Sequence, residues 1–420
     1  MNVIRLMRHS QFLRHNLVFF SGSVAVGALN YLYYPILGRM LTPGSFGEVQ
    51  TLVSLFLQLS IFLIVLSQVV VNIVANYTNE ASGNLFVFEF EKLALALGVL
   101  MLLASVFLRA KLQAFFHFAS SWPFILLALA VVATVPFTLR SAYLRGKQKF
   151  GLVSAGNIAG AGGKLVLSVA LVALGFGTIG AIGGVVLAQV AACGLVAWWA
   201  LRQGLTQPVG RRFSMPNVRL LLPELRYGFV VLVASLALTL QYSIDIVVIK
   251  HYFSADTAGL YAGIAAVARI LFFVTMSISQ VLISTVKLRN TPVQNQQFLR
   301  KSLLLLTGIS LPILVVLVAE PALVVRTLMG SSYMSLATLL PRLSIAVFIV
   351  AVLNLFVAYY LALRRYGIAV VTVLGLGVSC ALILLHHGSP HAVVDSLLAG
   401  SAAMLGLFGM WTLIERKRMV

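Results

Sequence analysis

Residues 47–77 read GEVQTLVSLFLQLSIFLIVLSQVVVNIVANY, a mostly apolar run in which Glu48 is the only charged residue. An α-helix needs about 20 apolar residues to cross the roughly 30 Å hydrocarbon layer of a bilayer, so this run predicts a transmembrane helix. Similar runs recur along nearly all of the 420 residues, of which 60% are hydrophobic and 10% are charged. The mean hydropathy of +1.02 is typical of a chain that is solvated by lipid.

Twelve such runs predict an all-α integral membrane protein of about twelve transmembrane helices. The predicted spans are 17–41, 47–77, 86–108, 118–139, 152–175, 178–201, 228–250, 257–286, 302–319, 334–363, 366–385 and 392–414. The first span follows three arginines but lacks a small-residue cleavage site, so we expect a retained helix rather than a signal peptide. The segments outside the spans are too short for a nucleotide-binding domain.

The net charge of +20 is distributed unevenly across the predicted membrane. With the N-terminus in the cytoplasm, and with residues toward the end of a span assigned to the adjacent side, 22 of the 30 lysines and arginines are cytoplasmic, six are on the outer side and two lie within spans. This asymmetry follows the positive-inside rule and predicts that both termini are cytoplasmic. The basic charge therefore indicates membrane topology and contact with anionic lipid headgroups, rather than nucleic-acid binding.

The sequence repeats itself after 212 positions. This shift places Ser67-Gln68-Val69-Val70 on Ser279-Gln280-Val281-Leu282, and it places Gly47 on Gly259. The offset contains six predicted spans, an even number, so both copies enter the membrane in the same orientation. An internal duplication into two parallel six-helix repeats explains the pattern, and such repeats suit alternating access to a cavity between them.

The repeat predicts an N-terminal lobe over 1–201 with helices 1 to 6, and a C-terminal lobe over 228–420 with helices 7 to 12. Between them, 202–227 contains five arginines and three prolines. This stretch is too polar to span a membrane and too short to form a domain, so we expect a basic cytoplasmic linker. A second polar stretch, 287–301, is expected to join the eighth and ninth helices on the same side.

Three of the charged residues within the predicted spans, Lys164, Asp245 and Arg269, are expected to need protein or aqueous surroundings. A charge at the centre of a transmembrane helix is unfavourable by about 2.5–3.5 kcal/mol on insertion scales. One hypothesis is that the two cations bind an anionic headgroup, with a diphosphate as the candidate, while Asp245 balances charge or couples an ion. The alternative is structural: Asp245 pairs with Lys164 or with Arg269 and holds the two halves together.

A set of uncharged amides is expected to line the same cavity and to bind sugar hydroxyls. Asn157 lies seven residues before Lys164, and Gln241 lies four residues before Asp245, so each amide shares a helix face with a charge. Three further amides form a weaker stripe across the first two spans, namely Asn30, Gln58 and Gln68.

The sequence shows no residues arranged for catalysis or for metal binding. Cys193 and Cys380 both lie inside apolar segments, which argues against a disulfide framework and a cysteine-based metal site. His386, His387 and His391 cluster in an outer loop, where a solvated loop is favoured over a metal site. We therefore expect a protein that is not an enzyme and has no cofactor or metal, and coupling to a proton or sodium gradient is left open.

Several motifs carry a family resemblance. They are LGRMLTPGSFG at 37–47, Asn157, Lys164, GFGTIGA at 175–181, Tyr227-Gly228, Ile244-Asp245-Ile246 and Ala258-Gly259-Leu260-Tyr261. On these residues, and over essentially its whole length, the chain resembles the polysaccharide and oligosaccharide flippases of the Wzx type. That family lies within the MOP/MATE superfamily, which includes multidrug and lipid II exporters.

The resemblance implies a two-lobe helical bundle in the plasma or inner membrane of a bacterium or archaeon. It also implies that the protein flips undecaprenyl-diphosphate-linked oligosaccharide from the cytoplasmic to the periplasmic leaflet, for O-antigen, capsule or exopolysaccharide synthesis. The expected partners are the lipid-linked oligosaccharide and membrane lipids, followed by a polysaccharide polymerase and glycosyltransferases.

Three alternatives stay open on the residues alone. A multidrug or lipid II exporter of the same superfamily would share the fold, because fold does not fix substrate. A membrane polymerase or glycosyltransferase would need catalytic residues in a sizeable outer loop, and none is visible in the sequence. A scaffold without transport activity would leave polysaccharide export intact after deletion of the gene.

Overall fold

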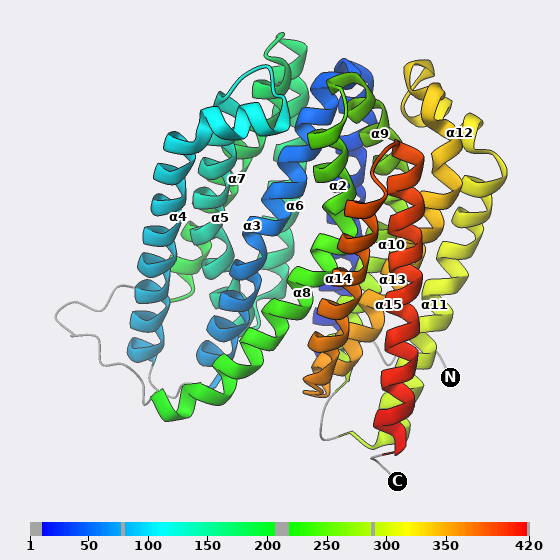
Figure 1. Cartoon of the computed structure of the whole chain (residues 1–420). Helices are drawn as coiled ribbons and strands as arrows, with labels where there is room; N and C mark the ends of the chain where they lie inside the picture. Colours follow the sequence, from blue (N-terminus) through cyan, green and yellow to red (C-terminus); the bar gives the residue numbers. More distant parts are fainter. Residues whose placement is uncertain (1–10, 77–79, 206–217, 287–289, 418–420) are drawn as a thin grey trace. The chain divides into compact units, whose positions relative to one another are not determined.

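The computed structural model describes residues 11–76, 80–205, 218–286 and 290–417, and the regular structure in these ranges is helical (Figure 1). The first half contains α2 (Gln11–Met40), α3 (Pro43–Asn76), α4 (Glu80–Phe116), α5 (Trp122–Gly146), α6 (Phe150–Ala173) and α7 (Gly177–Arg202). The second half contains α8 (Val218–Tyr252), α9 (Ala255–Ala268), α10 (Ile270–Thr285), α11 (Pro292–Ala319), α12 (Pro321–Leu328), the 3-10 helix η1 (Ser331–Leu339), α13 (Leu340–Ala362), α14 (Gly367–Leu385) and α15 (Pro390–Lys417).

The predicted membrane spans correspond to helices of this structure. Within the described ranges, eleven helices are long and apolar enough to cross a bilayer, and they match the predicted spans from the second to the twelfth. α2 occupies the position of the first predicted span, 17–41. The basic residues before Gln11 and the linker residues 206–217 lie outside the described residues. The prediction of an all-α membrane fold is confirmed.

Two helices begin about three turns earlier than the apolar pattern predicts. α8 begins at Val218 and α11 at Pro292, each ten residues before the predicted span. α11 begins at a capping box, in which Thr291 Oγ1 accepts from the Gln294 backbone N–H (3.3 Å) and Gln294 Oε1 accepts from the Thr291 N–H (3.0 Å). Hydropathy locates only the part of a helix that contacts lipid, so the apolar pattern places the first turns of these two helices outside the predicted spans.

The predicted eighth span, 257–286, consists of two helices that meet at Arg269. The Arg269 N–H donates to the Ala265 carbonyl (3.0 Å), and the Arg269 carbonyl accepts from the N–H groups of Phe272 and Phe273 (3.1 and 3.2 Å). The bond to Phe272 has the i to i+3 spacing of a tightened turn. The irregular turn therefore lies at one of the charged residues that the sequence assigns to the site.

The chain divides into two compact units, each of which is described by itself. Unit 1 comprises 1–33, 59–113 and 120–228. Unit 2 comprises 34–58, 114–119 and 229–420. Unit 2 therefore takes the last part of α2 and the first part of α3 together with the second half of the chain.

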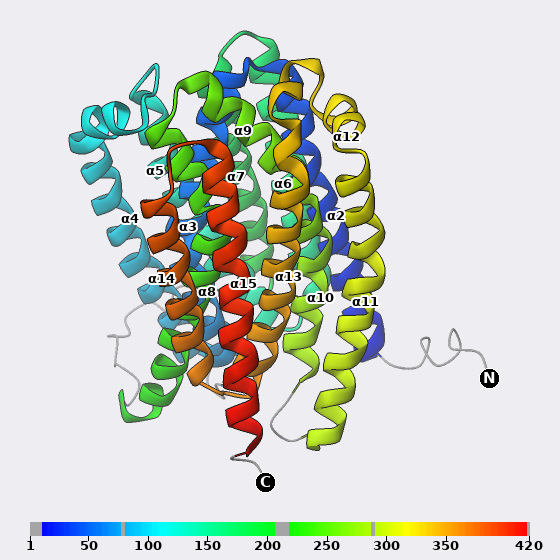
Figure 2. The ribbon, with the colours of Figure 1, turned by 45° about the vertical axis from the view of Figure 1, so that its right-hand side comes forward.

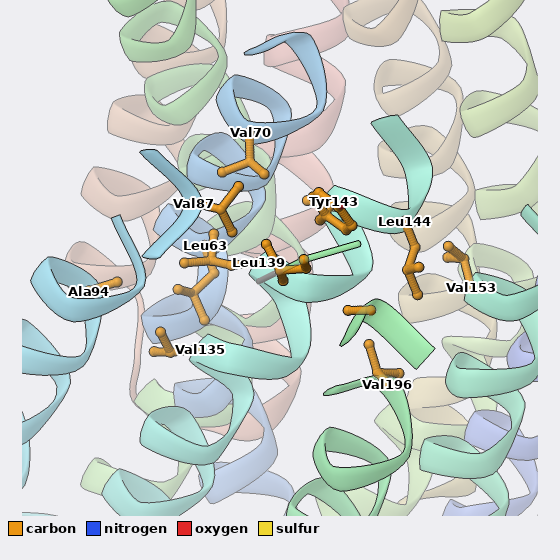
Figure 3. Packing of buried hydrophobic residues seen from close by; sticks show 13 residues of the cluster. Leu63, Val70, Val87, Ala94, Val135, Leu139, Tyr143, Leu144, Val153 and Val196 are labelled. Atoms are coloured by element: carbon orange, nitrogen blue, oxygen red, sulfur yellow. The ribbon is translucent and has the colours of Figure 1, made fainter. Parts of the chain in front are cut away.

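Unit 1 has an apolar core to which five helices, α3 to α7, contribute (Figure 3). The labelled side chains of this cluster include Leu63, Val70, Val87, Leu139, Tyr143, Val153 and Val196. The buried Tyr143 hydroxyl donates to the Gln203 carbonyl (3.1 Å), which ties α5 to the end of α7. α7 also packs along both α5 and α6. This packing fixes the position of α6, the helix that carries Lys164.

Unit 2 contains two apolar clusters that share α13. One cluster joins α8, α13, α14 and α15, and it includes Ala234, Leu353, Ile368 and Met404. The other joins α10, α11 and α13, and it includes Ile278, Leu306 and Leu355. α14 lies beside α15 (Figure 1), and α12 lies at the end of unit 2 opposite the C-terminal end of α15 (Figure 2).

The two glycines that the internal repeat aligns contact each other within unit 2. A Cβ atom on Gly47 would lie 2.8 Å from the Gly259 Cα and 2.9 Å from its nitrogen. A Cβ on Gly259 would overlap the carbonyl group of Pro43. Both contacts are shorter than side chains tolerate, so α3 and α9 approach so closely only because glycine stands at both positions.

Candidate functional site

The predicted site residues are divided between the two units. Unit 1 contains Asn30, Gln68, Asn157 and Lys164. Unit 2 contains Gln58, Gln241, Asp245 and Arg269. The two sets are therefore two local sites, each with its own geometry.

In unit 1 the structure brings Lys164 and Asn30 together. Lys164 Nζ donates to Asn30 Oδ1 and lies 4.6 Å from the centroid of the Tyr33 ring. Asn30 and Tyr33 are three residues apart on α2, so one helix face supplies both contacts. Within the described part of the chain, Lys164 forms no ion pair. Its positive charge is therefore held by a neutral amide and a ring face, which solvate a cation without neutralising it.

The other predicted residues of unit 1 are less enclosed. Asn157 is half-buried on α6, two helical turns before Lys164, so the two share a face of that helix. Gln68 is exposed on α3. Both amides are accessible for further hydrogen bonds, as a role in binding sugar hydroxyls would require.

In unit 2 the structure pairs Asp245 with Arg269. Arg269 Nη2 donates to Asp245 Oδ1 (2.7 Å) and to the Tyr242 carbonyl (2.9 Å). The Tyr261 hydroxyl donates to the other carboxylate oxygen (2.6 Å). The Asp245 and Arg269 residues are 1% and 5% exposed. Of the two partners that the sequence leaves open for Asp245, the structure selects Arg269.

This pair joins α8 to the turn between α9 and α10. The Arg269 guanidinium also lies over the Tyr242 ring, 4.8 Å from its centroid. Both carboxylate oxygens accept charge-assisted hydrogen bonds, and burial in low dielectric strengthens such bonds. The arrangement is a closed, hydrogen-bonded ion pair, and its geometry favours a structural role for these two residues. The pair braces helices of the second half and does not join the two halves, as the structural alternative had supposed.

Gln58 and Gln241 connect elements of unit 2. Gln58 Nε2 donates to Ser243 Oγ (3.0 Å), which links α3 to α8. Gln241 is fully buried, and its Nε2 donates to Ser401 Oγ on α15 (3.0 Å). Each of these amide nitrogens therefore has one N–H group bound within unit 2.

The sequence does not reveal the aromatic partners of the charges, nor one largely buried ion pair in unit 1. Tyr33 follows Asn30 at helical spacing, and Tyr261 contacts Asp245 from a different helix. Tyrosines are too frequent in these apolar helices for either position to be a specific signal in the sequence. Glu91 on α4 and Arg140 on α5 form a two-pronged pair in unit 1, with Nη2 to Oε1 at 2.7 Å and Nε to Oε2 at 3.1 Å. The sign available in the sequence was the position of Glu91, a charged residue inside the predicted third span.

Comparison with known proteins identifies the family. A family model described as polysaccharide biosynthesis protein matches residues 36–338, which is more than two thirds of the chain. No curated protein matches the chain significantly. The family match agrees with the resemblance that the sequence motifs indicate.

Solved structures share the fold over nearly the whole chain. An inward-facing multidrug resistance MATE family transporter of the MOP superfamily has a TM-score of 0.72 at 15% identity, covering 95% of this chain and 98% of that one. The lipid II flippase MurJ, in an inward closed conformation, has a TM-score of 0.70 at 11% identity, covering 94% and 87%. A MOP superfamily transporter from Pyrococcus furiosus has a TM-score of 0.59 at 15% identity, covering 96% and 95%.

These comparisons confirm the predicted fold, because two of the structures match it with TM-scores of 0.72 and 0.70 over 95% and 94% of this chain. At such low identities they concern the fold alone, whereas the family match covers the sequence itself. The chain is a multi-pass membrane protein that belongs to the polysaccharide biosynthesis protein family and has the fold of MOP superfamily transporters.

Proposed function

We propose that this protein is a flippase that moves undecaprenyl-diphosphate-linked oligosaccharide from the cytoplasmic to the outer leaflet by alternating access. The family connects the chain with polysaccharide biosynthesis, and the fold is that of transporters. Surface polysaccharides are assembled from polar sugar units that must cross the bilayer, and a transporter of this family supplies that step.

The observation that carries the proposal is the state of Lys164. Its ammonium group lies within a membrane-spanning helix and contacts only neutral partners among the described residues, Asn30 and Tyr33. A cation at this depth is unfavourable unless an anion or water compensates it. A diphosphate supplies the missing negative charge and accepts charge-assisted hydrogen bonds, and Asn157 on the same helix face is placed to bind an adjoining sugar.

Arg269 has a different part in this proposal. Its charge is already matched by Asp245 at 2.7 Å, so contact with the diphosphate would require the pair to open. Ion coupling at Asp245 would likewise require a proton or sodium ion to take the place of the guanidinium. We therefore assign the first contact with the headgroup to Lys164 and a bracing role in unit 2 to the pair.

The proposal includes location and partners. The protein lies in the plasma or inner membrane of a bacterium or archaeon with both termini in the cytoplasm, as the lysine and arginine asymmetry favours. The lobes 1–201 and 228–420 open alternately to the two sides of the membrane. Glycosyltransferases build the lipid-linked substrate on the cytoplasmic side, and a polymerase receives it on the other.

Deletion of the gene tests this function. We expect loss of surface polysaccharide and accumulation of complete lipid-linked oligosaccharide, with rescue by the wild-type gene and not by Lys164→Ala. Lys92→Ala is the matched control, because this lysine is also in unit 1 but its side chain is 59% exposed and paired with Glu89. Normal polysaccharide in the deletion strain, or full rescue by Lys164→Ala at equal protein level, would contradict the proposal.

The second candidate is an exporter of drugs or of lipid II. It is favoured by the high structural similarity to a MATE transporter and to MurJ, which are proteins with those functions. The same deletion strain separates the candidates. Unchanged polysaccharide with increased drug sensitivity would indicate the first kind of exporter, and accumulation of lipid II would indicate the second.

A further inference from the structure

Unit 2 contains a second cationic region, at the end opposite the C-terminal end of α15. A cavity of about 430 Å³ lies between the end of α2, the end of α12 and the start of η1. Its lining includes Arg39, Arg326, Ser331, Ser332 and Tyr333. Figure 2 shows α12 at this end of the unit. The volume falls within the range of about 300–1,000 Å³ that is usual for ligand pockets.

Arg39 is held in place at the wall of this cavity. Its Nε donates to the Leu328 carbonyl (3.0 Å), and its Nη2 donates to the Thr327 carbonyl. These carbonyls belong to the last turn of α12, where a cation is favourable because the C-terminal end of a helix carries the partial negative charge of its dipole. A guanidinium has five N–H donors, so the hydrogens of Nη1 are left for another partner.

Arg326 adds a second positive charge, and the start of η1 adds neutral donors. The Arg326 side chain is exposed and forms no ion pair within the described part of the chain. Gly330 has φ +102°, a conformation that favours glycine, and it turns the chain so that η1 begins with Ser331 and Ser332 at the cavity. The Tyr333 hydroxyl donates to the Gly38 carbonyl (3.1 Å) and fixes η1 to the end of α2.

No carboxylate lines the cavity among the described residues, so its two guanidinium charges are not neutralised by the wall. The distribution of basic residues along the chain also sets these two arginines apart. Only six of its 30 lysines and arginines are predicted on the outer side, and two of the six are Arg39 and Arg326. Residues that follow topology alone would be scattered, whereas these two are 287 positions apart in sequence and meet at one cavity.

We propose that this cavity binds a phosphate-bearing group on the outer side of the membrane. Guanidinium groups bind phosphate oxygens with charge-assisted hydrogen bonds in a defined planar geometry, and the serine hydroxyls add neutral donors. The identity of the group rests on the proposed function: it is the diphosphate of the lipid-linked substrate as it reaches the outer leaflet. The cavity then receives the headgroup after translocation, whereas Lys164 binds it during translocation.

Binding of inorganic pyrophosphate to the purified full chain in detergent tests the site. We expect Arg326→Gln to weaken binding at least tenfold, because it removes a charge-assisted contact. Arg342→Gln is the matched control, since this residue is another exposed arginine of unit 2 and is paired with Asp395. The effect of Arg326→Gln should be the same in wild type and in a Lys164→Ala background, because the two residues belong to different units and share no partner.

A polyprenyl diphosphate and phosphatidylglycerol identify the source of the phosphate. Tighter binding of the polyprenyl diphosphate than of phosphatidylglycerol, with the same loss of affinity in Arg326→Gln, would assign the cavity to the substrate headgroup. Binding of pyrophosphate alone would assign it to a soluble phosphate compound, and the phosphate site would stand without the substrate assignment. Equal pyrophosphate binding by wild type, Arg326→Gln and Arg342→Gln, or no binding by the wild type, would overturn the proposal.

The flippase proposal and this proposal fail separately. A deletion strain with normal polysaccharide, together with Arg326-dependent pyrophosphate binding, would remove the function and keep the phosphate site. Loss of polysaccharide in the deletion strain, together with equal pyrophosphate binding by wild type and Arg326→Gln, would support the function and remove the site.

Discussion

Lys164 and Arg269 look alike in sequence, since each is a basic residue inside an apolar helix, but the structure gives them different partners. Arg269 faces the carboxylate of Asp245 at 2.7 Å and is almost completely buried. Lys164 faces an amide and an aromatic ring and is half-buried. One charge is neutralised by the protein and the other is not.

The difference shows how charges within a membrane protein divide by role. A neutralised pair needs nothing further, so it acts on the stability of the unit that contains it. A cation with neutral partners is favourable only when an anion arrives, so it acts on binding. We therefore expect substitutions at the pair to alter stability most and substitutions at Lys164 to alter transport most.

The largest expected effect on stability is that of Asp245→Ala. It leaves the Arg269 charge buried without a partner, which typically destabilises by about 3–5 kcal/mol. A strong fall in the thermal unfolding temperature of the purified protein would show this, and adding Arg269→Leu to the same chain should restore much of the loss. An unchanged unfolding temperature for Asp245→Ala would remove the distinction between the two sites.

Tyr261→Phe should have the next largest effect. The substitution keeps the ring, but it removes one hydrogen bond to the Asp245 carboxylate, and a bond to a charged group contributes about 1.5–3 kcal/mol. Tyr333→Phe is the matched control, because that buried hydroxyl donates to the neutral carbonyl of Gly38 and should contribute only about 1 kcal/mol. Thermal unfolding of the two variants side by side measures the difference, and equal losses would mean that the charge of Asp245 does not strengthen its hydrogen bonds.

Lys164→Ala should change stability by less than about 1 kcal/mol, the usual size of one hydrogen bond, while it abolishes rescue of polysaccharide synthesis. The loss of its bond to Asn30 is offset by removal of a charge from the membrane span. The comparison of unfolding temperature with rescue separates the two properties. A large fall in the unfolding temperature of Lys164→Ala would mean that Lys164, like Asp245, acts mainly on stability.

The smallest effect is expected for Arg342→Ala. This arginine forms an ion pair with Asp395 at 2.9 Å, but the two side chains are 52% and 53% exposed. Exposed pairs contribute about 0–1 kcal/mol because water screens them. A loss as large as that of Asp245→Ala would show that burial does not determine the cost of breaking an ion pair in this protein.

The sequence predicted the fold well because lipid imposes one strong requirement, a long apolar run, and eleven helices within the described residues meet it. It also predicted that Lys164, Asp245 and Arg269 need partners. It did not show which partner Asp245 takes, because a basic residue on either of two helices satisfies the same rule. Nor did it show the cavity beside Arg39 and Arg326, because residues so far apart in the chain meet only through the packing of α2 and α12.

The contact between Gly47 and Gly259 has a consequence for the origin of the chain. The predicted internal repeat aligns these two glycines with each other, and in unit 2 they touch. A single-repeat ancestor that paired with itself about a two-fold axis would bring that glycine against its own counterpart. In the present chain, the crossing of α3 and α9 constrains both positions together, because a Cβ atom on either glycine would overlap the backbone of the facing segment.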